Sequence, residues 1–600
     1  MRLDHTPYAQ LRPIPKEAVK FQPGFWQERQ LRNRLAVSKL YEALKEHGVM
    51  DNFKRVNDPA IQRRGPWFTD SDLYKWLEAA CHVLPDPVIE PLAAEVVSLL
   101  LSAQGADGYL NTYFIHEHRE KRFSDLENAH ELYCAGHFIE AAIAHRRATS
   151  KEELFRAAVR FADYLVARFG PGKIEKADGH PEIELALVEL YRETGEKKYL
   201  ELARFFLERI NFRSQQEIQG HAVRAAYYAA GLADYYLETG DSDYLESIKR
   251  QWQNMVCEKI YITGGIGGRV HGESFGRPFE LPHEGAYAET CAAIASIFWN
   301  RRMLHILAEG RFADLLERTL YNGFLAGVSL SGDRYFYVNP LAYNGQPREL
   351  REAQRIYERK PWHDCTCCPP NAQRLLASLG DYFYSSSREG LWVHLYDNTA
   401  IQWQIDGVPV RLVQRGNYPW EGDLSFQLSL PKSHEFSLFL RLPLWARGYS
   451  LKVDGVEYEA KNRAGYLEIR RKWRDNSVEL SLELPTVLME ANSRLAETRG
   501  SVALMRGPLV YCLEQADNPN LSVLETRLDS ARRLTANKTA DLGGVVKIQG
   551  FGEVPIRPYG PLYRPWGSQR RLEDVELFFI PYYAWNNRDP GAMTVWLERG

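Results

Sequence analysis

The spacing of apolar residues changes near residue 385, and this change divides the chain into two structural regions. Up to about residue 384, apolar residues recur every three or four positions over long segments, which predicts amphipathic helices. Beyond it, short runs such as LWVHLY, VPVRLV and VELSLEL alternate apolar with polar residues, which predicts antiparallel strands. Because 600 residues exceed one ordinary core, we expect a helical domain over 1–384 and two β-sandwich domains over 385–490 and 491–600.

The helical segments of the first region follow one another with alternating short and long connections. We expect helices over 88–103, 130–148, 151–169, 181–194, 197–210, 221–239, 241–257, 285–306 and 308–327. The long connections, 104–129 and 258–284, carry distinctive motifs. Paired helices of this kind can close into a ring with those loops at one end. An open helical solenoid is the structural alternative, although no internal repeat favours it.

Composition argues against several classes of protein. A net charge of −3 gives no reason to expect a nucleic acid or an anionic membrane as a partner. No apolar run approaches the length of a membrane-spanning helix, and the start MRLDHTPYAQ has no apolar run typical of a signal peptide. Eight cysteines in 600 residues do not suggest a disulfide framework. We therefore expect a cytoplasmic protein.

Three of the eight cysteines, Cys365, Cys367 and Cys368, are crowded into the stretch WHDCTCCPPNAQR. The two prolines disfavour a helix interior, so we expect the cysteines in a stiff segment just before a helix that begins near Asn371. Adjacent cysteines are awkward partners for one disulfide, but as thiolates they can face a single metal ion. A zinc site would need about two further ligands.

A second stretch, AYAETCA, supplies Glu289 and Cys291 two residues apart. With Cys367 and Cys368 they would form a tetrahedral zinc shell of one carboxylate and three thiolates. The plainer alternative is that Cys291 is a small buried residue on a helix and Glu289 a surface charge.

These two stretches, together with Gly272 and Glu273 in HGESFGR, resemble glycoside hydrolase family 127, the β-L-arabinofuranosidase-like enzymes. Four further motifs look similar: DGYLNTYF from Asp107, HELYCAGH from His130, GHPEIELAL from Gly179 and YITGGIGG from Tyr261. The resemblance covers most of residues 20–380. It implies that the catalytic domain is an (α/α)6 barrel and that a homodimer forms through the C-terminal β-sandwich.

The resemblance also implies a retaining glycosidase in which Cys367 is the nucleophile and Glu273 the general acid and base. The zinc ligands that it carries over are Glu289, Cys291, Cys367 and Cys368. Zinc would keep the nucleophile a thiolate and stabilise it again as it leaves the sugar. We therefore expect an exo-glycosidase that releases L-arabinose from β-L-arabinofuranosides of plant oligosaccharides or glycopeptides.

Several other side chains are expected to line the sugar pocket. By resemblance these are His130, His180, His221, Tyr337 and His363, and Asp70 is a further candidate at the pocket rim. A histidine at the start of a helix is otherwise a cap or a packed core residue. Asp70 is alternatively the N-cap of the helix that follows GPWFT.

Other functions remain open at this stage. The same machinery would serve another furanoside or a rare pectic sugar. A carbohydrate-binding protein with a structural zinc, a lyase or epimerase, and a thiol redox protein using Cys365 and Cys367 are alternatives of other classes. No GK[ST] follows the glycines of YITGGIGG, so we do not expect nucleotide binding.

Overall fold

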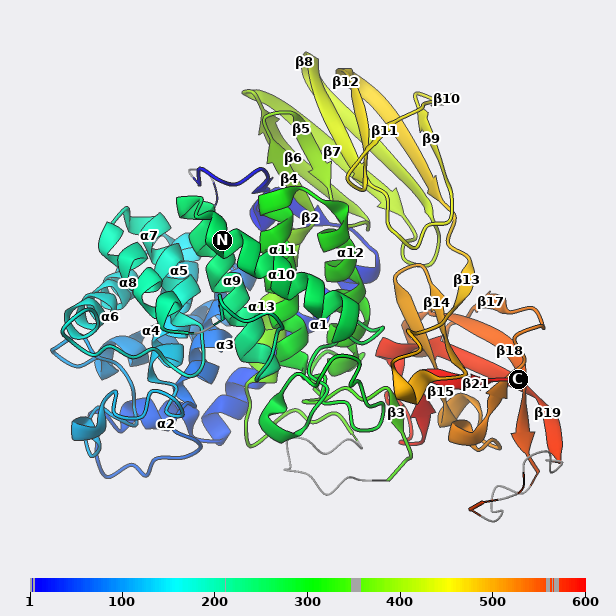
Figure 1. The fold of residues 1–600 in the computed structure, drawn as a ribbon. Coiled ribbons are helices and arrows are strands. Elements are labelled where there is room, and N and C mark those ends of the chain that lie inside the picture. Colours follow the sequence, from blue (N-terminus) through cyan, green and yellow to red (C-terminus); the bar gives the residue numbers. More distant parts are fainter. Residues whose placement is uncertain are drawn as a thin grey trace.

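The computed structural model describes residues 3, 6–210, 212–346, 358–556, 562, 563, 565 and 571–600. Its first part is helical and its second part β-rich, as the spacing of apolar residues predicts (Figure 1). The α-helices are α1 (Phe25–Glu46), α2 (Val49–Lys54), α3 (Asp70–Val83), α4 (Ile89–Ala103), α5 (Glu131–Thr149), α6 (Glu153–Arg168), α7 (Ile183–Thr194), α8 (Lys197–Arg209), α9 (Ala222–Thr239), α10 (Ser242–Glu258), α11 (Thr290–Leu307), α12 (Gly310–Arg318) and α13 (Cys368–Ala377).

Every second helix belongs to an inner layer that closes on itself. Helix α3 contacts α5, and the contacts continue through α7, α9, α11 and α13, which returns to α3. Helices α4, α6, α8, α10 and α12 each contact a member of this cycle from outside, and α1 contacts α13 and α3. The cycle brings the first and the last helix of the region together, so the helices form a closed ring.

Two helix boundaries differ from those expected. Helix α13 begins at Cys368 rather than near Asn371, because Pro369 and Pro370 occupy first-turn positions where no amide hydrogen is needed. The helix expected over 308–327 ends as an α-helix at Arg318 and continues through π-helical turns, Thr319–Phe324. There the side-chain amide of Asn322 bonds outside the helix, to the Pro508 carbonyl.

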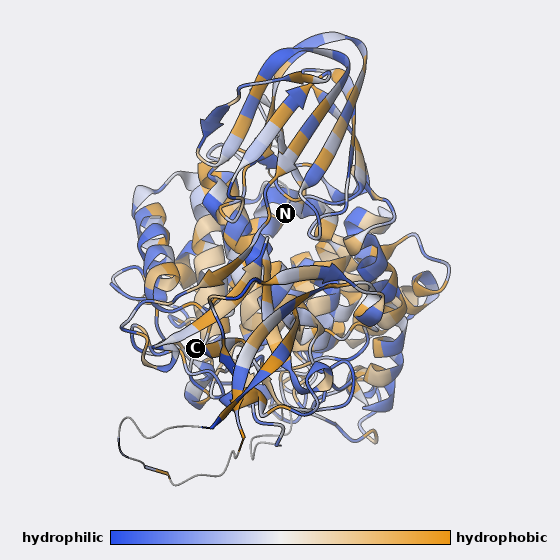
Figure 2. Cartoon of the chain, turned by 90° about the vertical axis from the view of Figure 1, so that its right-hand side faces the viewer, coloured by the Kyte–Doolittle hydropathy of each residue, from blue (hydrophilic) through white to orange (hydrophobic). Residues whose placement is uncertain are grey.

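In the described residues, the first β-rich region and the N-terminal lead-in together form one hydrogen-bonded sheet of 11 strands, the middle sheet. Its strands are β1 (Arg12–Pro13), β2 (Val19–Phe21), β4 (Tyr384–Ser387), β5 (Gly390–Val393), β6 (Thr399–Ile405), β7 (Val408–Gly416), β8 (Asp423–Arg441), β9 (Tyr449–Val453), β10 (Val456–Glu457), β11 (Lys461–Arg463) and β12 (Tyr466–Leu482). Apolar and polar residues alternate along these strands, visible as orange and blue bands in Figure 2.

Two of these strands are longer than the sequence suggests. The runs LSFQLSL and FSLFLRL are one strand, β8, and YLEIRR and VELSLEL are one strand, β12. The two strands pair along both halves, with a shift of register between Trp473 and Asp475. Pro431 lies in the unpaired part of β8 next to this shift, where its missing amide hydrogen costs no ladder bond.

The second β-rich region is a closed barrel, so the prediction of a second β-sandwich is wrong. Its strands, including the short β3 of the first region, are β3 (Ala342–Tyr343), β13 (Thr486–Met489), β14 (Ser501–Arg506), β15 (Leu509–Glu514), β16 (Arg527–Leu528), β17 (Thr535–Lys538), β18 (Val546–Pro555), β19 (Leu572–Pro581), β20 (Met593–Thr594) and β21 (Trp596–Arg599). Pairing runs β14–β21–β16–β18–β19–β15 and returns to β14. Among the described residues, closure gives each of the six strands in this cycle a neighbour on both sides. It depends on long-range pairs that local spacing does not reveal.

The N-terminal lead-in contributes two short strands to the middle sheet. Strand β1 pairs with β4, and β2 pairs with β6. One large apolar core then runs from the second half of the helical ring into both sheets, and a second core lies among α1 to α8. Within the described residues, no helix combines the length and apolar content needed to cross a membrane.

Candidate active site

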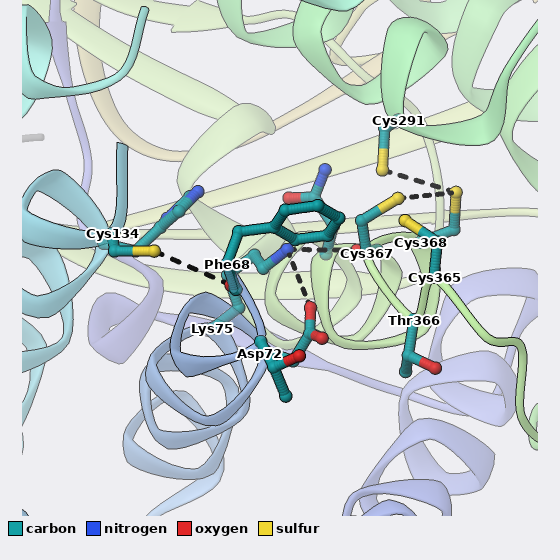
Figure 3. Close-up of polar contacts among 12 residues, drawn as sticks. Phe68, Asp72, Lys75, Cys134, Cys291, Cys365, Thr366, Cys367 and Cys368 are labelled. Carbon is teal, nitrogen blue, oxygen red and sulfur yellow. Dashed lines mark hydrogen bonds and ion pairs between the residues drawn. The ribbon is translucent and has the colours of Figure 1, made fainter. Parts of the chain in front are cut away.

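Four side chains from two distant stretches form a compact cluster, as the sequence predicts. The ligand atoms of Glu289, Cys291, Cys367 and Cys368 all lie within 4.8 Å of one another. The sulfur of Cys368 is 3.4 Å from that of Cys291 and 3.8 Å from that of Cys367, as Figure 3 shows by dashed lines. The Glu289 carboxylate lies 3.7 Å from the Cys367 sulfur. All four groups therefore face one point.

The starts of two helices bring these residues together. Glu289 is the residue just before α11, and Cys291 is in its first turn. Cys367 stands just before α13, and Cys368 is its first residue. A helix N-terminus carries partial positive charge, which favours thiolate and carboxylate groups beside it. Both helix ends therefore stabilise the ionised form of the cluster.

The cluster is buried, and its acidic groups repel one another when ionised. Burial and then Cys367 raise the pKa of Glu289, and burial likewise raises that of Cys368. Burial also raises the pKa of Cys291, but hydrogen bonds with Cys367 and Cys368 outweigh it and lower the value to about 6. Within the part of the chain that the structure describes, one carboxylate oxygen of Glu289, Oε2, has no hydrogen-bond partner. Three sulfurs and a carboxylate with one unbonded buried oxygen are ligands that suit a cation at the centre of the cluster.

Glu273 lies directly beside the cluster. It ends a short 3-10 turn, His271–Glu273, in which Gly272 and Glu273 both have left-handed backbone angles. Its carboxylate is 2.9 Å from the Nε2 atom of His221, and ligand atoms of Glu273, His221 and Glu289 lie within 4.8 Å of one another. The Glu273 side chain is 22% exposed, so a substrate can reach it.

Three of the predicted histidines form a row that leads to Glu273. The ring centroids of His130 and His180 are 5.4 Å apart, and those of His180 and His221 are 6.0 Å apart. Burial, and then Arg224, lowers the pKa of His130 to about 4. Burial and then His130 lower that of His180 well below its usual value. Both rings are therefore neutral near pH 7, and each can offer one donor and one acceptor.

The remaining predicted pocket residues divide into two groups. The hydroxyl of Tyr337 lies 3.5 Å from the Cys367 sulfur, and the Tyr337 ring is 6.3 Å from that of His363. Asp70 is fully buried, and its two oxygens accept hydrogen bonds from the amide and hydroxyl of Thr112. It is not an N-cap either, because α3 starts at Asp70 itself. Asp70 therefore joins α3 to the 107–114 segment.

Two residues near the site were missed in the sequence. The carboxylate of Asp178 accepts from the amides of Leu132 and His180, which fixes the loops that carry His130 and His180. Lys75, on α3, is 1% exposed and reaches the Cys367 segment. A lysine inside the apolar run LYKWLEAA, three residues after Asp72, was the available signal.

Comparison with known proteins identifies the family. The model of the GH127 β-L-arabinofuranosidase catalytic domain matches residues 18–381, and those of the GH127 middle and C-terminal domains match 390–485 and 486–598. The chain belongs to glycoside hydrolase family 127. It is therefore a glycoside hydrolase.

Relatives of this family match nearly the whole chain. A non-reducing end β-L-arabinofuranosidase of Bifidobacterium longum subsp. longum is 36% identical, with 94% of each chain covered. The crystal structure of a GH127 β-L-arabinofuranosidase from Geobacillus stearothermophilus T6 superposes with a TM-score of 0.93 at 37% identity, covering 97% of this chain and all of that one. A second GH127 β-arabinofuranosidase structure gives 0.92 at 34% identity, covering 99% and 98%.

Proposed function

We propose that this family 127 enzyme is a zinc-dependent, retaining exo-glycosidase that releases L-arabinose from non-reducing-end β-L-arabinofuranosides of plant oligosaccharides or glycopeptides. The names of its relatives support the sugar. The observation that carries the mechanism is the unequal burial of the thiols. Cys291 and Cys368 are 4% and 0% exposed, whereas Cys367 is only partly buried and lies on the side of Tyr337. Within the cluster, Cys367 is thus the sulfur that a sugar can reach.

The chemistry proceeds in two displacements. The Cys367 sulfur attacks the anomeric carbon, the bond to the leaving oxygen breaks, and Glu273 gives that oxygen its proton. Water then attacks the same carbon while Glu273 takes a proton from it, and the carbon–sulfur bond breaks with its electron pair returning to sulfur. Two inversions retain the configuration. His221, 2.9 Å from the Glu273 carboxylate, orients this acid and base.

Glu289, Cys291, Cys367 and Cys368 would hold the zinc ion. In a tetrahedral shell with Zn–S bonds of about 2.3 Å, neighbouring sulfurs lie about 3.8 Å apart. The observed separations of 3.4 and 3.8 Å fit this geometry. When bound, zinc would keep the cysteines ionised and lower the basicity of the departing thiolate. The resulting sulfur is a weaker base and a better leaving group.

The sugar hydroxyls would be held by the row of His130, His180 and His221, with Tyr337 and His363 on the side of the cysteines. Neutral histidines suit this role because a hydroxyl is both donor and acceptor. The short distances between neighbouring rings support a pocket that holds one furanose ring at the end of the row.

We further infer how the whole chain is organised. The closed cycle of helices supports an (α/α)6 barrel, and the two-sided alternation of β8 and β12 supports a sheet that folds over itself as a sandwich. The family-model matches support a division into 1–384, 385–490 and 491–600. We also propose that the enzyme acts in the reducing cytoplasm, which its eight free cysteines support. A homodimer through the C-terminal domain is a further proposal, supported by family resemblance alone.

The first experiment measures cleavage of an aryl β-L-arabinofuranoside by the wild type, Glu273→Gln and Cys367→Ser, with zinc determined in each preparation. We expect both variants to lose at least about 1,000-fold in kcat, since each removes a reacting group. Zinc should remain in Glu273→Gln. A zinc-loaded wild type that cleaves only another furanoside or a pectic sugar would contradict the proposed substrate. Full activity of Cys367→Ser would contradict the nucleophile.

A further inference from the structure

We propose that Lys75 is a positioning residue of the reaction: its buried ammonium group fixes the main chain of the nucleophile Cys367 and supplies the positive charge that makes the sulfur a better leaving group. The proposal rests on the proposed function. It concerns a residue outside the zinc shell and the sugar pocket described above.

Three contacts place the ammonium group between the inner helices and the nucleophile. The Nζ atom of Lys75 donates to the carbonyl oxygen of Cys367 at 3.4 Å and to the Tyr133 hydroxyl at 3.3 Å. It lies 3.4 Å from a carboxylate oxygen of Asp72, one turn away on α3. Figure 3 shows Lys75 reaching from α3 toward Cys367, with Asp72 below it. Lys75 thereby links α3 and α5 to the residue that precedes α13.

The charge of the cluster explains why a cation is useful there. As three thiolates and a carboxylate, the cluster would carry four negative charges, of which a bound divalent ion would neutralise two. A net negative charge in a buried site is costly unless a positive group lies nearby. Lys75 is 1% exposed, so water does little to screen its charge from the cysteines. Its field therefore favours electron density on the Cys367 sulfur.

This field acts most strongly on the second displacement. When water attacks the anomeric carbon, the carbon–sulfur bond breaks and its electron pair becomes negative charge on the Cys367 sulfur. A fixed cation stabilises that developing charge without having to reorient. In the first displacement the same cation makes the thiolate a slightly weaker nucleophile. Loss of Lys75 should therefore slow breakdown of the thioglycosyl-enzyme more than its formation.

The test uses Lys75→Met, whose side chain has similar length and no charge. With an aryl β-L-arabinofuranoside in rapid-quench experiments, we expect a burst of aryl alcohol followed by steady-state turnover about 10- to 100-fold slower than in the wild type. Intact mass spectrometry should then detect the accumulated thioglycosyl-enzyme, with zinc content unchanged. Slowing of both steps by the same factor, or an unchanged kcat, would overturn the proposal.

Two further variants separate positioning from folding. Lys75→Met leaves the Asp72 carboxylate buried and unpaired, so the double variant Asp72→Asn/Lys75→Met removes both charges. It should fold like the wild type and still show slow breakdown, whereas wild-type rates would mean that Lys75 only neutralises Asp72. Lys16→Met is the matched control. The Lys16 amine also donates to a carbonyl of α3, that of His82 at 2.9 Å, and pairs with Glu17. In Lys16→Met, the thioglycosyl-enzyme should form and break down at the wild-type rates.

A spectroscopic measurement needs no sugar and so stands apart from the proposed activity. In the enzyme loaded with Co²⁺, the thiolate-to-cobalt absorption band should move to longer wavelength in Lys75→Met, because the sulfurs become richer in electron density. An unmoved band would count against Lys75 even in an active enzyme. A shifted band in a protein that cleaves no arabinofuranoside would instead contradict the proposed substrate.

Discussion

Directly after strand β5 of the middle sheet stands a histidine, His394, that is held neutral by its surroundings. It is 2% exposed, and its Nδ1 atom lies 2.7 Å from the Tyr466 hydroxyl. Burial, and then Arg441 and Arg301, lower its pKa to about 3. An unfolded histidine has a pKa of about 6.5, so below that pH the unfolded state binds a proton that the folded state refuses. The contribution of neutral His394 to the free energy of unfolding is therefore complete above about pH 6.5, and it is lost as the pH falls toward 3.

We expect this histidine to account for about 2 kcal/mol of the stability lost between pH 7 and pH 5. In His394→Gln the glutamine keeps an acceptor for Tyr466 but does not titrate. Between pH 7 and pH 5 this variant should therefore lose about 2 kcal/mol less stability than the wild type. Denaturant unfolding at the two pH values measures the difference. His434→Gln, in the same sheet and only half-buried, is the control. Equal losses in wild type and His394→Gln would disprove this role.

Residue chemistry in the sequence predicted the cluster, but not every neighbour of it. Glu289, Cys291, Cys367 and Cys368 share a chemistry that few structural roles require, so spacing and family resemblance were enough to group them. Lys75 could not be found in this way, because a single lysine in an apolar helix is common and its partner is some 290 residues away. The contact between Asp70 and Thr112 could not be predicted for the same reason, since only the fold brings the two residues together.

At the scale of elements, the site is built from the starts of helices. His130, His221, Glu289 and Cys367 each stand directly before the first residue of α5, α9, α11 or α13. None of them caps its own helix through the side chain. Their side chains are therefore free for the pocket, and the positive ends of several inner helices point at it.

One close approach of backbone holds the loop before α7 against the loop before α5. A Cβ atom at Gly179 would lie 2.1 Å from the Glu127 carbonyl oxygen, and the Gly179 amide donates to Leu126 at 2.7 Å. Gly179→Ala should push the His180 loop away from the His130 loop and lower kcat/KM about 100-fold, as expected for a displacement of about 1 Å. Steady-state kinetics on an aryl arabinofuranoside measures the loss.

Gly195→Ala is the matched control for Gly179→Ala. Gly195 ends α7 with a φ of +74°, and none of the described residues has an atom within 4 Å of an added Cβ atom. Its substitution should cost roughly 1 kcal/mol of stability and leave KM unchanged. Equal effects of the two substitutions on kcat/KM would refute the positioning role of Gly179.

Elements were predictable where local pattern decides them. The helices of the first region fall within a few residues of the predicted segments, because amphipathic spacing is a local property. The merging of two runs into β8, and the closure of the barrel through the pairing of β14 with β15, depend on partners far along the chain. A proline and a few polar residues looked like breaks, although β8 passes through them.

At the scale of the whole molecule, a buried arginine joins the helical region to the middle sheet. Arg441, at the end of β8, is fully buried and donates to Asp314 and Glu317 of α12 at 2.5 and 2.6 Å. Arg441→Met would leave the buried Glu317 carboxylate without its arginine partner, and Asp314 with only the charge of Arg318 nearby. We expect a loss of roughly 3–5 kcal/mol in the free energy of unfolding, measured by denaturant titration.

Arg470→Met provides the comparison on the same sheet. The Arg470 side chain is 64% exposed and pairs with Glu435 at 3.2 Å, so its removal should cost less than about 1 kcal/mol. If the two arginine variants were equally stable, Arg441 would not be the link between the domains.

The closed cycle of helices has a consequence for the order in which the protein is made. Cys367 and Cys368 stand at the start of α13, the helix that closes the ring against α3. A nascent chain that ends before residue 367 has an open ring and two of the four cluster residues. The strands β1 and β2 must wait still longer, for residues 384–401 that pair with them. On the ribosome, the cluster of Glu289, Cys291, Cys367 and Cys368 is thus completed only when the last helix of its region has been made.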